Sequence, residues 1–189
     1  MTNIVIFASG TGTNAENIAR HFADSDVVNV AALFTGNPRA GAIERMERYG
    51  VPCRVFSREQ WNNPTEIVDE LRRLDTRLIV LAGFLSMVHK PIIDAVGGNI
   101  INIHPSLLPR HGGKGMWGMN VHRAVLDAGD QESGITIHYV TEEIDGGAII
   151  CQRRCPVMPG DTPQSLAERV HQLEYEALPE VIGQLAARL

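Results

Sequence analysis

The sequence predicts an α/β protein with a mostly parallel central sheet and helices on both faces of that sheet. Strand-like and helix-like segments alternate over the first half of the chain, which is typical of parallel strands joined by helical crossovers. The segments 3–8 and 99–104 are apolar at consecutive positions, as expected for strands buried on both faces. With 189 residues the chain is long enough to bury one sizeable core, so a single domain over 1–189 is expected.

Seven segments have the composition of strands. The first five are separated by helical segments, whereas the last two follow each other directly, so antiparallel or mixed strands are expected there. The sixth alternates Ile135, Ile137 and Tyr139, a period of two that indicates one buried face. The predicted strands cover 3–8, 27–34, 52–56, 77–82, 99–104, 134–140 and 148–157.

Six segments have helical composition, and several carry helix signals. Gly50 follows the second and is a good helix stop. The third repeats apolar residues at 67, 68, 71 and 74, which is helical spacing. The last is one long helix in which any kink is expected near Pro179. The predicted helices cover 15–23, 40–49, 64–74, 91–96, 120–128 and 162–189.

Composition excludes several classes of function. The formal charge of −5 argues against broad binding of nucleic acid or anionic membranes. No apolar run reaches the roughly 18 residues that span a bilayer, and no signal peptide precedes the first strand. Three cysteines without metal-ligand spacing indicate reduced thiols, so a cytoplasmic protein without a metal site is expected.

The glycine-rich turn 9–14 follows the first predicted strand and precedes a helix. Glycines let the backbone approach a ligand closely, and the free N–H groups of a helix N-terminus suit a phosphate. The second strand ends in Thr35-Gly36-Asn37, without the acid that holds a dinucleotide ribose, so a single phosphate is favoured. The alternative is a capping box formed by Thr13 and Glu16, which can coexist with phosphate binding.

Asn102 and His104 are two positions apart at the end of the fifth strand, so they point the same way. An amide can donate to a developing oxyanion, and a nearby carboxylate such as Asp145 raises an imidazole pKa. Together they indicate a catalytic site at this strand end. The alternatives are a hydrogen-bonded structural histidine and a simple hairpin turn at Asp145-Gly146-Gly147.

Four other features support two interpretations each. The loop 111–118 is rich in glycine and is either a lid or a disordered insertion. The apolar loop 81–88 holds a flat ring system or packs in the core. His122 and His138 are expected to be structural rather than metal ligands. Glu174 alone would be a solvated helix residue.

Taken together, the motifs resemble those of the glycinamide ribonucleotide formyltransferase family, folate-dependent enzymes of purine synthesis. The run Asn102-Ile-His-Pro-Ser-Leu-Leu-Pro109 is specific for formyl-folate transferases and hydrolases, and the glycine loop narrows the match to this branch. The other matching pieces, in family order, are Leu81-Ala-Gly-Phe84, His122-Arg123 and Ile144-Asp-Gly-Gly147. The resemblance implies a Rossmann-like formyltransferase fold.

The resemblance also implies residue roles. Asn102, His104 and Asp145 match the catalytic trio. The substrate phosphate would be held by Gly12, Thr13 and Asn14, and its ribose by Glu174. The folate pocket would be lined by Leu85, Ser86, Met87, Val88 and Asn102 and closed by Thr141, Glu142, Glu143, Ile144 and Asp145.

Some positions depart from the family pattern. Relatives often have Arg where Ser86 stands and a second histidine where Asn120 stands, and the loop 110–118 is longer than in many of them. The Leu108–Pro109 bond is expected to be cis, as in relatives.

The reaction that the resemblance implies is formyl transfer from 10-formyltetrahydrofolate, the cosubstrate, to the amine of glycinamide ribonucleotide. Asn102 and a protonated His104 would stabilise the oxyanion, and Asp145 would keep His104 charged. The alternatives are a formyltetrahydrofolate hydrolase, a methionyl-tRNA formyltransferase, for which the basic extra domain is missing, and a non-enzymatic nucleotide-binding module. Small-molecule partners are expected, and the oligomeric state is open.

Overall fold

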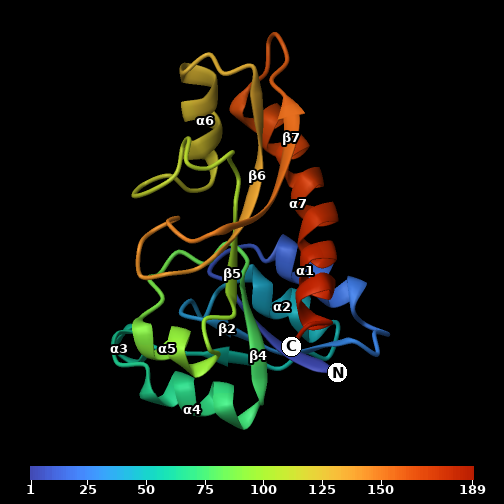
Figure 1. Cartoon of the computed structure of the whole chain (residues 1–189), viewed down its shortest axis with the longest axis vertical. Coiled ribbons are helices and arrows are strands. Elements are labelled where there is room, and N and C mark those ends of the chain that lie inside the picture. Colours follow the sequence, from blue (N-terminus) through green and yellow to red (C-terminus); the bar gives the residue numbers. More distant parts are fainter.

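The computed structural model describes residues 1–189, and its centre is one seven-stranded sheet with the strand order β3-β2-β1-β4-β5-β6-β7 (Figure 1). The first five strands along the chain pair in parallel, whereas β6 is antiparallel to β5 and β7 is antiparallel to β6. The strands are β1 Thr2–Phe7, β2 Val28–Thr35, β3 Cys53–Val55, β4 Thr76–Leu81, β5 Ile100–His104, β6 Glu132–Tyr139 and β7 Ile149–Pro156.

Seven helices connect and flank these strands (Figure 1). The last is the longest, begins with a Thr162–Ser165 capping box and continues through Pro179. The helices are α1 Thr13–His21, α2 Gly41–Glu47, α3 Arg58–Asn62, α4 Thr65–Arg73, α5 Lys90–Ala95, α6 Met119–Asp127 and α7 Pro163–Ala186.

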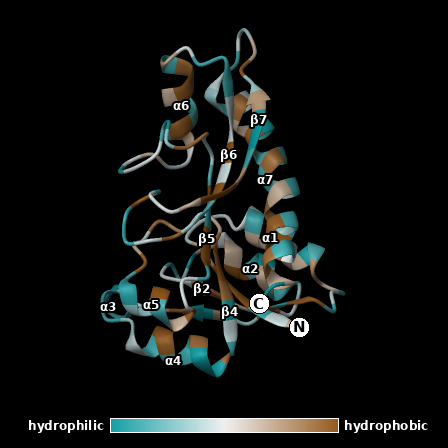
Figure 2. Ribbon diagram, in the orientation of Figure 1, coloured by the Kyte–Doolittle hydropathy of each residue, from teal (hydrophilic) through white to brown (hydrophobic).

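The sheet separates two apolar cores. On one face, alternate side chains of the strands pack against α1, α2, α6 and α7. On the other face, α3, α4 and α5 cover a smaller core that includes Phe7, Phe34 and Trp61. Figure 2 shows hydrophobic residues concentrated along the strands and the inner sides of the helices. Burial on both faces explains why the β1 and β5 segments are apolar at consecutive positions.

The predicted fold class is confirmed: the sheet is mostly parallel, helices cover both faces, and the last two strands are antiparallel. The short helix α3, with its Ser57–Gln60 capping box, was not predicted. Five residues are too few to show a helical period in sequence. The third strand is also shorter than predicted, because only Cys53–Val55 pair with β2.

The strand order places several chain turns at one edge of the sheet. The chain runs outward from β1 through β2 to β3 and then returns to the opposite side of β1 at β4. Such a reversal opens a crevice beyond the carboxyl ends of the strands, where ligands of open α/β sheets bind. The turns after β1, β4 and β5 all reach this edge. None of the helices combines the length and apolar composition of a membrane-spanning segment.

Candidate active site

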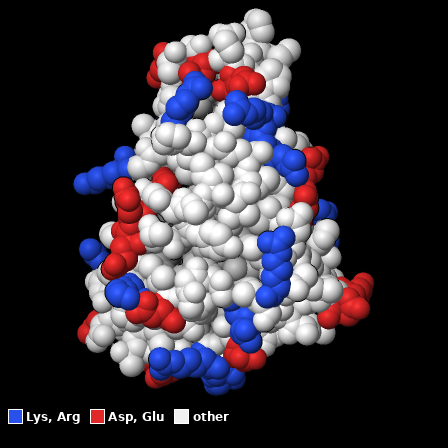
Figure 3. Space-filling view, in the orientation of Figure 1, with Lys and Arg blue, Asp and Glu red and all other residues white.

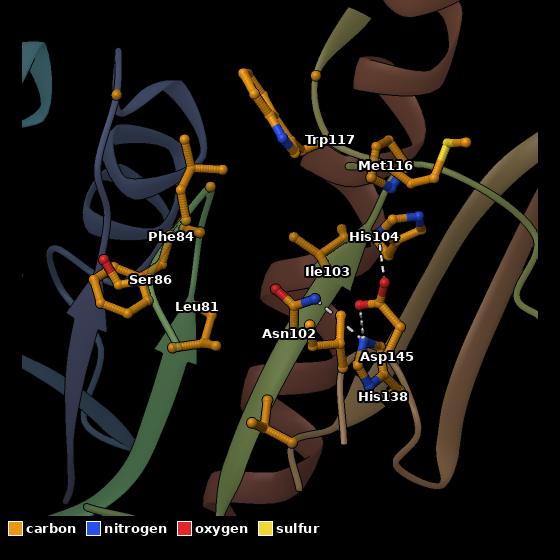
Figure 4. A pocket seen from close by; sticks show the side chains of 18 of the residues that line it. Leu81, Phe84, Ser86, Asn102, Ile103, His104, Met116, Trp117, His138 and Asp145 are labelled. Carbon is orange, nitrogen blue, oxygen red and sulfur yellow. Dashed lines mark hydrogen bonds and ion pairs between the residues drawn. The ribbon is translucent and has the colours of Figure 1, made fainter. Parts of the chain in front are cut away.

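A cavity of about 740 Å³ lies at the carboxyl edge of the sheet. Its volume is in the range usual for small-molecule sites. Figure 4 shows Phe84 and Ser86 on one side of this cavity and His104, Met116 and Asp145 on the other. All the site residues predicted from the sequence line it: Gly12, Thr13, Asn14, Leu85, Ser86, Met87, Val88, Asn102, His104, Thr141, Glu142, Glu143, Ile144, Asp145 and Glu174.

The glycine turn forms one part of the cavity wall. Gly12 is the N-cap of α1 and has a φ of 77°, in the left-handed region that favours glycine. A Cβ at Gly12 would lie 2.4 Å from Ala42 of α2, so the turn also needs glycine for close packing. No side chain caps α1, and the alternative of a Thr13–Glu16 capping box is therefore wrong. The first N–H groups of α1 remain available to a ligand.

Glu174 reaches the same part of the cavity from α7. Its side chain is only 5% exposed, and Oε2 accepts a hydrogen bond of 2.8 Å from Asn14 Nδ2. Burial raises the pKa of the Glu174 carboxyl, although His171 and the Asn14 amide act in the opposite direction. The expectation that Glu174 alone would be solvated is thus wrong, because α7 packs directly against α1 at this point.

Unpartnered polar atoms gather near Glu174. Of the six buried side-chain polar atoms without a hydrogen-bond partner, three belong to cavity residues: Asn14 Oδ1, His122 Nδ1 and His171 Nδ1. Buried polar groups are normally paired, since leaving one unpaired costs about 1–3 kcal/mol. The concentration of these atoms in one region indicates a binding surface for a polar ligand.

Asn102 is held by a residue on the neighbouring strand. His138 lies directly opposite Asn102 in the antiparallel β5–β6 pair, and Asn102 Nδ2 is 3.1 Å from His138 Nε2. His138 Nδ1 is 2.8 Å from the Tyr139 carbonyl oxygen, which can only accept, so Nδ1 carries the proton and Nε2 accepts from Asn102. This contact orients the amide, and Figure 4 shows its oxygen turned toward the open space facing Leu81 and Phe84.

One ring nitrogen of His104 makes a hydrogen bond to the backbone, and the other faces Asp145. Nε2 donates a 2.8 Å hydrogen bond to the His111 carbonyl oxygen, whereas Nδ1 lies 3.6 Å from Asp145 Oδ2 (Figure 4). Because a carbonyl oxygen cannot donate, Nε2 carries the proton in the neutral ring. Nδ1 is therefore the atom that can gain or lose a proton at the site.

Asp145 faces both histidines. Oδ2 lies 3.6 Å from His104 Nδ1, and Oδ1 lies 3.6 Å from His138 Nε2. Oδ2 also accepts a 2.8 Å hydrogen bond from Gly113 N. Burial raises the carboxyl pKa, but the neighbouring His138 ring, the Gly113 N–H and the His104 ring together outweigh it and hold the pKa below its usual value. Asp145 also has a φ of 54°, an unusual conformation that is common at functional sites.

The expected protonation state of His104 requires a correction. The Asp145 charge alone would raise the His104 pKa, as expected from the sequence, but burial lowers that pKa below its ordinary value. The bond to the His111 carbonyl and the Asp145 charge both act in the opposite direction and are outweighed. The His104 side chain is only 6% exposed, so loss of hydration is the dominant effect. The lowered pKa favours the neutral form of the His104 ring near pH 7.

The remaining wall of the cavity is apolar and open to solvent. Four large side chains on it are more than half exposed: Leu85, Met87, Trp117 and Ile144. Behind them, Phe84 packs edge-on against Phe7 at a centroid distance of 5.4 Å. An exposed cluster of this kind on a small protein marks a binding surface for an apolar ligand.

The loop after β5 packs against the site. Ser106 Oγ donates a 2.6 Å hydrogen bond to the Arg110 carbonyl oxygen, and the Leu108–Pro109 bond is cis, as the resemblance implied. Residues 113–118 line the cavity. Of the two interpretations of this loop, its place on the cavity wall favours the lid.

Comparison with known proteins identifies the family. The protein-family model described as "Formyl transferase" matches residues 2–182 of this chain. The chain is 36% identical to phosphoribosylglycinamide formyltransferase of Bacillus subtilis, covering 98% of this chain and 95% of that one. The chain belongs to the phosphoribosylglycinamide formyltransferases of the formyl transferase family. The chloroplastic enzyme of Arabidopsis thaliana is 38% identical, with 95% of this chain and 64% of that relative covered.

Solved structures of formyl transferases agree in fold. Glycinamide ribonucleotide transformylase 1 from Geobacillus kaustophilus superposes with a TM-score of 0.89 at 38% identity, covering 98% of this chain and 99% of that one. The Anaplasma phagocytophilum phosphoribosylglycinamide formyltransferase gives a TM-score of 0.90 at 33% identity, with 99% and 88% covered. The Rossmann-like formyltransferase fold expected from the resemblance is therefore confirmed.

Some site residues of this formyl transferase were missed in the sequence. His138 was interpreted as structural, although the alternation of Ile135, Ile137 and Tyr139 already placed it on the opposite face of its strand. His111 and His171 carried no recognisable signal. No group of three or more His, Cys, Asp or Glu side chains is arranged to hold a metal ion.

Proposed function

We propose that this chain transfers the formyl group of 10-formyltetrahydrofolate to the amine of glycinamide ribonucleotide in de novo purine biosynthesis. The observation that carries the proposal is a cavity that combines a helix N-terminus, a buried polar cluster and an exposed apolar wall. These three surfaces suit the phosphate, the ribose and the pterin ring of the two substrates.

The acceptor substrate occupies the region around α1 in this proposal. The N–H groups at Gly12, Thr13 and Asn14 bind the phosphate at the positive end of α1. Glu174 accepts hydrogen bonds from the ribose hydroxyls, and its bond to Asn14 aligns the two groups. Asn14 Oδ1 and His122 Nδ1 have no hydrogen-bond partner and are available to the ligand, and His171 Nδ1 lies 3.6 Å from Glu174 Oε2.

The folate donor occupies the apolar part of the cavity. The segment from Leu85 to Val88 forms one side of this pocket and Thr141 to Asp145 the other. Leu85 and Ile144 lose exposed apolar surface when a ring system lies on them, which favours binding by about 25 cal/mol per Å². Ser86 supplies no charge for the folate tail.

The proton moves through His104 in the proposed mechanism. As the amine attacks the formyl carbon, the second N–H of Asn102 Nδ2 stabilises the oxyanion. His104 Nδ1 accepts the proton that the attacking nitrogen loses, and Asp145, 3.6 Å away, stabilises the imidazolium that forms. When the bond from carbon to N10 breaks, the same proton passes to N10, directly or through water. A neutral resting His104 suits this role, because the ring must be free to accept a proton.

In this proposal the partners are small molecules and the location is the cytoplasm. Figure 3 shows Lys and Arg interspersed with Asp and Glu on the face in view, without a large basic patch. The cytoplasmic location stays a prediction, because relatives include a protein named chloroplastic as well as bacterial proteins without such a label.

A pair of assays tests the proposed reaction. Formyl transfer to glycinamide ribonucleotide is measured alongside release of tetrahydrofolate in buffer alone. Transfer that requires the amine substrate is the expected result, and release in water at the same rate would instead show a hydrolase. His104→Ala is expected to lower kcat by about 10²–10⁴-fold with both substrates still bound. Binding of phosphate ligands with neither activity would overturn the proposal.

A further inference from the structure

One short segment contacts both His104 and Asp145 through its backbone. The carbonyl oxygen of His111 accepts a 2.8 Å hydrogen bond from His104 Nε2. Two residues later, Gly113 N donates a 2.8 Å hydrogen bond to Asp145 Oδ2. The position of this segment therefore decides how the imidazole and the carboxylate face each other.

The segment is itself anchored by a side chain. His111 Nε2 lies 2.7 Å from Oδ2 of Asp130, in the turn between α6 and β6. Both side chains are largely buried, with exposed fractions of 16% and 14%. Arg110 contacts the other oxygen of Asp130, but its side chain is 55% exposed, so that contact is weakened by solvent.

The backbone of His111 has an unfavourable conformation for a residue with a side chain. Its φ is 54°, in the left-handed region, where a residue with a Cβ is less stable than glycine by roughly 1–2 kcal/mol. Neighbouring positions in the same loop, Gly113 and Gly115, carry glycine at positive φ. A histidine at such a position indicates that its side chain contributes something that glycine cannot, and the contact with Asp130 is the interaction it makes.

We propose that the His111–Asp130 pair is a positioning device that holds the His111 carbonyl against His104, so that Nε2 keeps its proton and Nδ1 is left to exchange one. His111 and Asp130 act through His104 and are positioning residues, not catalytic ones. The inference rests on the proposed function only for its kinetic consequences, because the state of the His104 ring can be measured in the resting protein.

Two substitutions at His111 separate the side chain from the backbone. His111→Gly relieves the left-handed strain but removes the anchor, whereas His111→Gln places an amide N–H close to the position of the histidine Nε2. The proposal expects His111→Gly to lower kcat by about 10- to 100-fold, with KM for both substrates changed by less than about twofold. His111→Gln is expected to retain most of the activity. If only backbone conformation mattered, glycine would be the better replacement.

Asp130→Asn tests the other partner, and Arg110→Gln is the matched control. Arg110→Gln removes only the exposed contact to the same carboxylate and is expected to leave kcat within about twofold. Asp130→Asn is expected to resemble His111→Gly. The two variants also keep the proposal testable if His111→Gly does not fold.

Nitrogen NMR of the His104 ring provides a readout that a merely structural role would not move. The wild-type protein is expected to show one tautomer, with the proton on Nε2, and His111→Gly and Asp130→Asn are expected to show a mixture. A single Nε2–H tautomer in both variants would overturn the inference, as would an unchanged kcat. If the wild-type protein shows no formyl transfer, the proposed function fails, whereas the NMR result still decides this inference.

Discussion

Asn14 in the first turn of α1 donates a 2.8 Å hydrogen bond to Glu174 in the middle of α7, across 160 positions of sequence. The bond joins the helix whose N-terminus suits a phosphate to the carboxylate proposed to hold the ribose. The distance between the phosphate and ribose sites is therefore set by the packing of two helices. Substitutions of Glu174 and of Gly12 therefore test where glycinamide ribonucleotide, the proposed formyl acceptor, binds in the cavity.

Glu174→Gln is expected to raise KM for glycinamide ribonucleotide about tenfold and to change kcat much less. The substitution keeps the shape of the side chain but weakens hydrogen bonds to the ribose, and bonds to charged groups contribute about 1.5–3 kcal/mol. Steady-state kinetics with each substrate varied in turn measures the effect. Glu176→Gln, on the exposed side of the same helix, is the control. Equal KM values in the two variants would remove Glu174 from the ribose site.

Gly12→Ala is expected to destabilise the protein by about 2–4 kcal/mol, because the new Cβ would lie 2.4 Å from Ala42 at a φ of 77°. It is also expected to weaken binding of phosphate-containing substrates. Gly10→Ala is the matched control, since a Cβ there would meet nothing within 4 Å. Urea denaturation measures both free energies of unfolding. Similar values for the two variants would contradict the close packing of the turn.

Asp145→Asn is expected to lower kcat by about 10²–10⁴-fold with small changes in KM. The amide keeps the size of the side chain but no longer stabilises a positive charge on His104, 3.6 Å away. Asp94→Asn, which removes only an exposed i,i+4 ion pair with Lys90, is expected to be neutral. Single-turnover rates with both substrates saturating give the comparison. A rate for Asp145→Asn within threefold of the wild type, roughly the scatter of such assays, would eliminate the proposed role.

The lowered pKa of His122 predicts that the folded state becomes less stable as the pH falls. Burial lowers its pKa to about 4, and the nearby His171 and His104 act in the same direction. The unfolded chain takes up this proton near pH 6.5, whereas the folded chain does not until about pH 4, so the unfolded state gains relative stability as the pH falls through this range. Between pH 7 and pH 5 this linkage costs the folded state about 2 kcal/mol.

His122→Asn removes the titrating group and tests this prediction. The free energy of unfolding in urea is measured at pH 7 and at pH 5 for both proteins. The wild type is expected to lose about 2 kcal/mol more than the variant. Asp145 and Asp161, whose pKa values are lowered, stay ionised over this range, and Glu174, whose pKa is raised, is present in both proteins. Equal losses would show that His122 is protonated normally.

The pKa of His104 could not be predicted from the sequence, although the position of its side chain could. A period of two placed Asn102 and His104 on one side of a strand, and the structure brings both to the cavity. The same reasoning assigned His104 a raised pKa from Asp145 alone. Loss of hydration depends on everything packed around a side chain, and no local pattern reports it.

His138 and His111 show a second limit. His138 meets Asn102 because β6 pairs with β5 in one particular antiparallel register. His111 meets Asp130 because the loop after β5 folds back onto the turn before β6. Register and loop path arise from contacts between distant segments, so neither pairing could be predicted from spacing.

The sequence by itself determined the α/β class, the strand end that carries Asn102 and His104, and the glycine turn before α1. Each of these follows from local rules: the period of side chains along a strand, the rigidity of proline and the freedom of glycine. Only the tertiary structure decided that Glu174 bonds to Asn14, that His138 orients Asn102 and that burial lowers the His104 pKa. These depend on burial and on contacts between segments far apart in the chain, which exist only once the sheet and its helices have packed together.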